Sequence, residues 1–397
     1  MKYVCGLFRR FALLFSALLL SAGGAVQYYA GALPDHFFTE SGKAVTVPAL
    51  LPVTLHRCTE TLPQQAELRL FGMIPVKTVS LSAFQPASVY VGGEPFGIRM
   101  LMEGVMVVSL GEIRTADGTV SPARAAGIEV GDIIQSVNGR PVRGNADLQA
   151  AVSASGGAPV SVTLLRDGEP FSVTVQPAYA AAGHRWQTGM WVRDSTAGIG
   201  TVTYYVPSEN GQISFGGLGH AVCDADTGEQ IPLRSGEVVT VSVDEIVAGT
   251  AGKPGELRGS FAKEEDAGTL LANTDSGVYG VMEELPEKQL LVPLGSRQDI
   301  RRGDAWIYTT LQGTEPEAYS VRIEEIRGND SALRDLVIRV TDDRLLRETG
   351  GIVQGMSGSP IVQDGKLVGA VTHVFVRDPT RGYGIFAENM YGRQIGF

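Results

Sequence analysis

Apolar residues are arranged along the chain mostly in short runs rather than in long helical stripes. Runs at 105–110, 160–165 and 171–175 are each flanked by glycine or by an Asp-Gly pair. Short apolar runs that end at such turn signals predict strands. The segments with helical spacing are few, namely 121–128, 145–153, 243–248 and 343–348. We therefore predict a mainly β protein with few helices.

The N-terminal pattern differs from the rest of the chain. Arg9 and Arg10 precede an apolar run at 11–20, which continues through small residues to Val26. A basic segment followed by an apolar segment is typical of a signal peptide or a membrane anchor. We expect residues 1–32 to be one of these two, with the body of the protein exported. A helix buried in a protein core is the alternative.

Turns and breaks at glycine and proline residues divide the rest of the chain into three parts. Residues 33–87 are rich in proline and predict a stalk with a β-rich lead-in. Residues 88–178 predict a self-contained α+β domain. Residues 179–397 predict an all-β, barrel-type domain, since short strands and glycine turns recur throughout.

The segment "SPARAAGIEVGDIIQSVNGRPV" at 121–142 resembles a PDZ domain of bacterial proteases. That resemblance implies a carboxylate-binding loop formed by Gly97, Ile98, Arg99 and Met100. A peptide C-terminus or a piece of the chain itself would then add a strand beside 105–110. The alternative is a domain that packs only against the rest of the chain.

The clearest chemical signal is the segment GMSGSP at 355–360. A serine hydroxyl needs a base to become a nucleophile, and the developing oxyanion needs N–H donors. The flanking glycines would allow the N–H groups of Gly355 and Ser357 to converge as an oxyanion hole. The pattern resembles the nucleophile turn of chymotrypsin-like serine proteases. Met356 stands where those enzymes carry an acid, which argues against activation by a new N-terminus.

A base must come from five histidines. His36, His56 and His184 lie in stalk or linker segments, whereas His220 is surrounded by glycines in GGLGHA. Such a setting permits close approach of a substrate, so we assign His220 as the base and His373 as the runner-up. The residues alone leave the third member open among several carboxylates: Asp224, Asp226, Asp244, Asp275, Asp342 and Asp343.

Two longer segments carry a closer resemblance. "GGLGHAVCDADTGE" and "TGGIVQGMSGSPIVQDGKLVGAVTHVFVRDPTRGYGI", behind a PDZ domain, resemble the stage IV sporulation protein B family of serine peptidases. The resemblance implies a triad of Ser357, His220 and Asp342. It also implies a regulatory endopeptidase of endospore formation, located between forespore and mother cell. Such proteins process themselves and cleave a membrane-bound regulator of an intramembrane protease, which activates a late mother-cell sigma factor.

Composition limits the remaining options. The formal net charge of -10 argues against nucleic-acid binding. The three cysteines have no zinc-type spacing, so we expect no metal and no cofactor. Cys58 and Cys223 either pair or remain free thiols. Two alternatives to the regulatory peptidase are an exported quality-control PDZ protease and a catalytically inactive PDZ adaptor.

Overall fold

The computed structural model describes residues 16–394, except for 18, 32, 34–35, 40–46, 48, 58–64, 84–86, 209–210, 289 and 328–333. Residues 1–15, 18 and 32 of the predicted signal or anchor therefore lie outside the described residues, as does Cys58. Among the helices that are described, none is both long enough and apolar enough to cross a bilayer. Cys223 is a free, exposed thiol.

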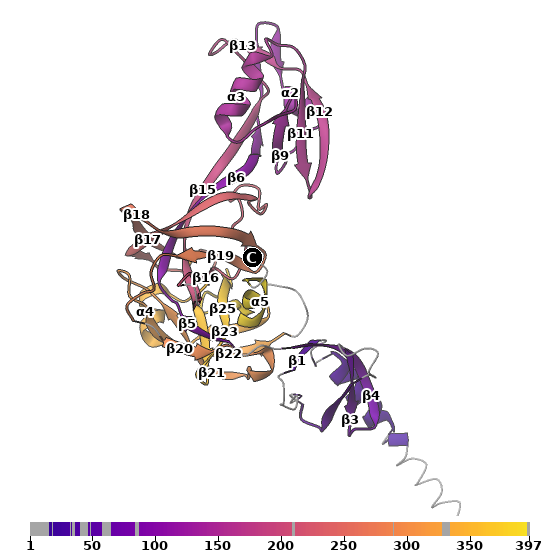
Figure 1. Cartoon of the computed structure of the whole chain (residues 1–397). Coiled ribbons are helices and arrows are strands. Elements are labelled where there is room, and N and C mark those ends of the chain that lie inside the picture. Colours follow the sequence, from indigo (N-terminus) through magenta and orange to yellow (C-terminus); the bar gives the residue numbers. More distant parts are fainter. Residues whose placement is uncertain are drawn as a thin grey trace, which may run out of the picture.

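An N-terminal module precedes the domains that carry the chemistry. Its residues 19–31 are helical, and its sheet has the strand order β1 (His36–Thr39), β4 (Ile74–Ala83), β3 (Gln65–Leu70) and β2 (Val53–Arg57). The helix contributes Tyr29 to a small core with Phe37 and Leu68. This module lies beside the main body at the lower right of Figure 1.

Two six-stranded barrels make up the main body. In the first, the strand order is β6 (Pro95–Leu110), β17 (Leu233–Val247), β18 (Glu256–Thr274), β19 (Gly277–Met282), β16 (Ile213–Gly217) and β15 (Met190–Pro207), and pairing of β15 with β6 closes the ring. The second is a closed barrel of β21 (Gly303–Thr309), β22 (Glu317–Ile326), β23 (Leu336–Val340), β26 (Arg381–Phe386), β25 (Lys366–Val374) and β24 (Pro360–Gln363). The prediction of a barrel-type peptidase domain is confirmed.

Shorter elements border the barrels. They are β5 (Ser88–Val91), β20 (Leu290–Pro293), the 3₁₀ helix η1 (Arg297–Asp299), α4 (Asp343–Thr349) and α5 (Ala387–Gln394). Each barrel has its own apolar core, and a third cluster between them includes Tyr204, Leu367 and Met390. Apolar packing therefore holds the two barrels together, because separating them would expose this cluster to water.

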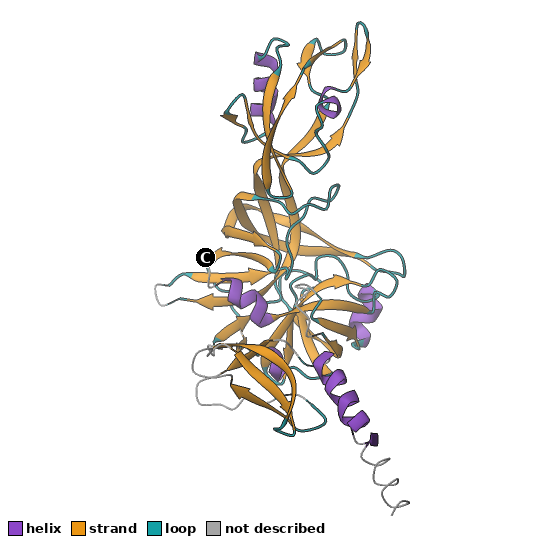
Figure 2. Cartoon of the chain, turned by 90° about the vertical axis from the view of Figure 1, so that its right-hand side faces the viewer, coloured by secondary structure: helices purple, strands orange, loops and turns teal. Residues whose placement is uncertain are grey.

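The PDZ domain is inserted between β6 and β15, at the end of the arm that these two strands form (Figure 1). Its elements are β7 (Ile113–Thr115), β8 (Gly118–Val120), α2 (Pro122–Ala125), β9 (Ile133–Val137), β10 (Arg140–Pro141), α3 (Asn145–Ala154), β11 (Val160–Arg166), β12 (Glu169–Val175), β13 (Ala178–Ala180) and β14 (Arg185–Gln187). Helices α2 and α3 lie beside strands in this domain (Figure 1 and Figure 2). The helices predicted around Pro122 and 145–153 are confirmed.

The structure differs from the predicted boundary at residue 88. Residues 88–102 belong to the barrel layer, where β5 pairs with β15 and β20. The first half of β6 pairs with β15 on one side and with β17 on the other. Only beyond Gly104, at φ +88°, does β6 enter the PDZ sheet and pair with β9. The N-terminal part of the predicted PDZ domain is therefore barrel structure.

This arrangement corrects the predicted carboxylate-binding loop. Gly97, Ile98, Arg99 and Met100 lie in the middle of β6 and pair residue by residue with both β15 and β17. Their N–H groups are committed to two strand ladders, so they do not form a loop that could receive a peptide terminus. A second correction concerns 243–248, which we expected to be helical. Most of this segment lies in β17, where long-range pairing overrides local spacing.

Candidate active site

The turn around Ser357 is fixed to the first barrel by β15. Thr201 donates its N–H to the Ser357 carbonyl at 2.9 Å and its hydroxyl to the Gly355 carbonyl at 2.8 Å. The buried hydroxyl of Thr203 donates to the Gly358 carbonyl at 2.7 Å. Sequence reasoning missed both threonines, because a polar residue in an apolar strand does not reveal a partner so distant in sequence.

Gly358 is required by the closeness of this contact. Its φ is +95°, and a Cβ atom there would lie 2.0 Å from the Thr201 carbonyl oxygen and 2.5 Å from the Leu218 nitrogen. No side chain fits in that space, and the positive φ favours glycine independently. The glycine in the serine motif therefore serves the docking of the two barrels as well as the turn itself.

The hydrogen bonds of the turn leave two backbone donors unused and direct the serine hydroxyl to a carbonyl. No hydrogen bond among the described residues uses the N–H of Gly355 or of Ser357, so both are available to an oxyanion. The Ser357 hydroxyl donates to the Thr372 carbonyl at 2.7 Å rather than to a histidine. In this rotamer the hydroxyl proton is therefore held by a backbone carbonyl and not by a histidine.

His220 follows a strained turn at the end of β16. Leu218 has a φ of +65°, which is costly for a branched residue, and Gly219 has a φ of +70°. A Cβ on Gly219 would come within 3.1 Å of the Thr372 and Ile385 methyl groups of the second barrel. The turn thus brings the backbone of the first barrel against the second, and His220 against His373, with ring centroids 4.8 Å apart.

The tautomer of His220 follows from its hydrogen bond. Nδ1 lies 2.8 Å from the carbonyl oxygen of Ala221. A carbonyl only accepts, so Nδ1 carries the proton and Nε2 is left as the acceptor. Burial lowers the pKa of His220 below its ordinary value, although this backbone bond opposes the shift. The neutral ring, which is the form that can act as a base, is therefore favoured.

His373 shares this environment. Burial, the neighbouring His220 and Arg334 together lower its pKa, so that it too is neutral near pH 7. Its ring lies on β25 immediately after Thr372, which accepts the Ser357 hydroxyl. Both histidines line the same cleft, with His373 beside the predicted base.

A cleft of about 450 Å³ between the barrels joins these groups. Ser357, His220, His373 and Gly355 all line it. The other lining residues are mainly apolar or small: Ile98, Thr196, Gly198, Ile199, Leu218, Ala221, Val222, Cys223, Pro254, Ile352, Val353, Gln354, Thr372, Val374 and Val376. No acid, lysine or arginine is among them, so the cleft suits uncharged side chains.

The structure places Asp342 away from its predicted role. Its carboxylate accepts the N–H groups of Arg344 at 3.0 Å and Leu345 at 3.1 Å, as the N-cap of α4. A further bond of 3.4 Å comes from the Ser320 N–H. Nδ1 of His220 instead faces Ala221, so the described residues do not bring Asp342 and His220 together. A capping aspartate before a helix is a sequence signal that could have indicated this role.

The strand predicted to accept a peptide in the PDZ domain is already paired on both sides. Val105 and Met106 pair with β9. On the other edge, Met106 to Leu110 pair with Met190 to Arg193 of β15. β-strand addition needs a free edge, so a peptide cannot add beside this part of β6 without displacing β15.

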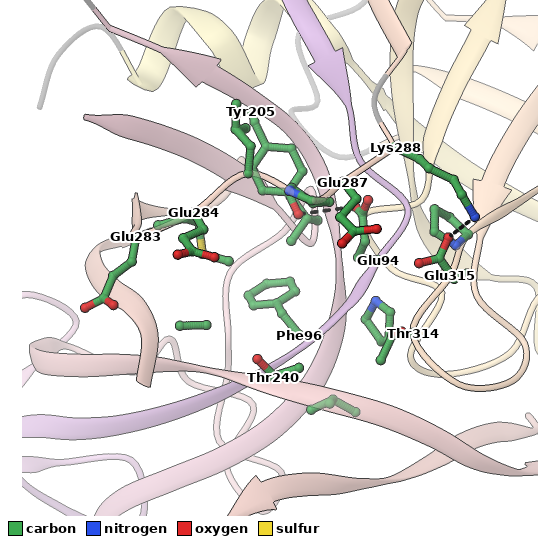
Figure 3. A pocket seen from close by; sticks show the side chains of 18 of the residues that line it. Glu94, Phe96, Tyr205, Thr240, Glu283, Glu284, Glu287, Lys288, Thr314 and Glu315 are labelled. Carbon is green, nitrogen blue, oxygen red and sulfur yellow. Dashed lines mark hydrogen bonds and ion pairs between the residues drawn. The ribbon is translucent and has the colours of Figure 1, made fainter. Parts of the chain in front are cut away.

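A larger cavity, of about 790 Å³, lies elsewhere on the first barrel (Figure 3). Glu94, Glu283, Glu284 and Glu287 line it, and Lys288 is paired with Glu315 at 3.0 Å. Burial raises the pKa of Glu94 to about 7, and Tyr205 donates to its carboxylate. None of the predicted site residues lines this cavity.

Comparison with known proteins decides the family. Residues 184–391, more than half of the chain, match the family described as SpoIVB peptidase S55. The chain belongs to this family. Residues 118–166 match a PDZ domain, so the recognition made from the sequence motifs is confirmed in both parts. No curated protein matches the chain.

Two solved structures have weaker similarity. The active form of the Rv3671c protease from M. tuberculosis is 17% identical, with a TM-score of 0.28, over 50% of this chain and 74% of that one. The inactive Ser343Ala mutant of Rv3671c is 14% identical, with a TM-score of 0.27, over 50% of this chain and 80% of that one.

Proposed function

We propose that this serine peptidase is an endopeptidase in which Ser357 is the nucleophile and His220 is the general base. The convergence of both side chains on one cleft, beside the available N–H groups of Gly355 and Ser357, carries the proposal. Nε2 of the neutral His220 would accept the hydroxyl proton as Ser357 attacks a peptide carbonyl. The two N–H groups would stabilise the oxyanion, and His220 would then return the proton to the leaving amine.

The resemblance assigns a third role to Asp342, as the acid of the triad. In the present geometry the Ala221 carbonyl holds the Nδ1–H, while Asp342 caps α4. We therefore propose that the carbonyl orients the base and that Asp342 supports α4, which leads through Gly350 towards the nucleophile turn.

Membership of the family supports a regulatory role in endospore formation. We propose that the protein is exported to the space between forespore and mother cell, associated with the membrane through residues 1–32. There it would process itself and cleave a membrane-bound regulator of an intramembrane protease. The uncharged cleft suits apolar or small residues next to the cleaved bond.

Mass spectrometry of the purified exported portion over time tests the activity. Discrete shortening of the wild type, with Ser357→Ala and His220→Ala remaining intact, is the expected result. Each substitution should lower the rate by roughly 10⁴-fold or more, because nucleophile and base act as a unit. Processing that continues in Ser357→Ala would overturn the assignment of the nucleophile. Wild-type protein that neither shortens nor reacts with a serine-directed phosphonate would overturn the proposal in favour of an inactive adaptor.

A further inference from the structure

Strand β15 contacts each part of the molecule that the proposed chemistry needs. At its start, Met190 and Val192 pack against the apolar core of the PDZ domain. Further along, Thr196 and Ile199 line the catalytic cleft. Thr201 and Thr203 then hold the nucleophile turn. One continuous strand therefore links the PDZ domain to the site (Figure 1).

Arg193 lies on this strand between the PDZ core and the cleft. The pairing of β15 with β6 shifts register on both sides of it, between Trp191 and Val192 and between Arg193 and Ser195. Such irregularities redirect side chains relative to a regular ladder. The guanidinium forms ion pairs with two residues of the loop that follows His220: Asp224, and Asp226 at 2.6 Å.

Asp224 is the organising residue of that loop. Its side chain is 0% exposed, and its Oδ1 accepts the N–H groups of Asp226 and Thr227, each at 3.0 Å. Burial opposes its ionisation, but these bonds and Arg193 hold its pKa below the ordinary value. Without Arg193 the buried carboxylate would keep only its hydrogen bonds from Asp226 and Thr227, and the loss of its ion-pair partner is unfavourable. The loop therefore depends on Arg193 for its present conformation.

The opposite side of the same loop is held by the first barrel alone. Asn273 of β18 accepts the Val222 N–H at 2.8 Å and donates to the carbonyls of Val222 and Ile231, both at 2.9 Å. His220 precedes this loop, and its Nδ1 bond to Ala221 uses the loop backbone. The base is thus positioned from two sides, by Asn273 within the barrel and by Arg193 from the arm that carries the PDZ domain.

We propose that Arg193 is a positioning residue for His220, through which the PDZ-bearing arm controls the geometry of the base. The inference rests on the proposed function, because it presumes that His220 is the base. A partner that displaces Met190 to Arg193 from β6, as an added peptide strand would, must also withdraw Arg193 from Asp224. Binding at the PDZ domain and reactivity at Ser357 are then linked by one ion-pair network.

The test compares Arg193→Met with Arg193→Lys and Asp226→Asn in the whole exported portion. Two quantities are measured: the rate of labelling of Ser357 by a phosphonate, and the pKa of His220 by NMR in a Ser357→Ala background. His373 of β25 faces His220 and is followed in the same spectra. Arg297→Met is the matched control, since it breaks another ion pair, with the buried Glu388, outside this loop.

Arg193→Met should slow labelling by roughly 10- to 100-fold, the scale expected for a misplaced catalytic group. The pKa of His220 should rise towards its ordinary value as the loop opens to water. Arg193→Lys should recover part of both effects, and Asp226→Asn, which removes only the exposed partner, should show a smaller shift in the same direction. Arg297→Met should lower thermal stability without changing either quantity.

A folded Arg193→Met protein with unchanged labelling and an unchanged His220 pKa would overturn the positioning role. Equal effects from Arg297→Met would overturn it as well, because the cause would then be general stability. Failure of the proposed function gives a different result: wild-type protein that is not labelled at all, while the NMR measurement still reports whether Arg193 controls His220.

Discussion

The two barrels contribute to the same cleft but are built differently. The second barrel, which carries Ser357, uses a nearly continuous stretch of chain, and its six strands form one closed ring. The first barrel, which precedes it and carries His220, takes strands from both sides of the PDZ insertion, and two of them continue into that domain. The proposed nucleophile therefore lies in a barrel built from one stretch of chain, whereas the proposed base lies in a barrel that shares β6 and β15 with the PDZ domain.

This difference indicates where regulation can act. The Ser357 turn is docked by backbone contacts too close to admit even a methyl group. The His220 loop is held by side chains, whose ion pairs and amide bonds can be exchanged for water or for a partner's groups. Control through His220, the proposed base, would therefore require less disruption than control through Ser357, the proposed nucleophile.

Among the substitutions that test this difference between the barrels, Gly358→Ala should have the largest effect. The new Cβ would meet the Thr201 carbonyl at 2.0 Å, so the turn must separate from the first barrel. We expect a loss of labelling at Ser357 on the order of 10²-fold. Gly365→Ala is the control, because Gly365 also has a positive φ, +75°, but open space around it. Equal losses in the two variants would attribute the effect to backbone conformation alone.

Thr203→Val should be the next largest change. It leaves the buried Gly358 carbonyl without its donor, at a cost of about 1–3 kcal/mol in the free energy of unfolding. Thr309 is the control, because its buried hydroxyl has no partner among the described residues and its removal should not lower the free energy of unfolding. Thr309→Val should be neutral or stabilising in chemical denaturation. A neutral Thr203→Val would mean that the barrels do not depend on this bond.

Substitutions of Asp342 should have the smallest effect. They distinguish its two candidate roles, as the acid of a triad and as the N-cap of α4. Asp342→Ala removes the cap of α4 and should cost about 1 kcal/mol of stability. Asp342→Asn keeps a capping side chain, so we expect both stability and labelling of Ser357 close to wild type. Asp343→Asn, at the exposed next position, is the control. A stable Asp342→Asn protein that had lost its reactivity would instead support the triad role that the family resemblance implies.

The sequence predicted structure well where a chemical motif is formed by residues that are close together in the chain. The serine motif, the glycines around His220 and the helix starts at Pro122 and Asp343 are short-range signals, and the structure places them as turns, a cleft and helices. The PDZ signature and the family were recognised from motifs of the same kind. Each of these depends on residues close together in the chain.

What the sequence did not reveal depends on pairing between distant strands. Nothing local distinguishes Gly97 to Met100 in a loop from the same residues in a strand, because the partners lie in β15 and β17. The bonds from Thr203 to Gly358 and from Arg193 to Asp224 could not be predicted from the sequence either, because the partners are far apart along the chain. Asp342 was assigned from a motif, and its local surroundings in space indicate a cap instead.

The insertion of the PDZ domain between β6 and β15 also has a consequence for how the chain folds. The first barrel closes only when these two strands meet, and the residues between Leu110 and Met190 separate them along the chain. An unfolded insert of that length would impose a loop-closure entropy on barrel closure, whereas a folded PDZ domain holds the two strands side by side in advance. The PDZ domain thus preorganises β6 and β15 of the barrel that contains His220, and unfolding of the PDZ domain would slow the closure of this barrel.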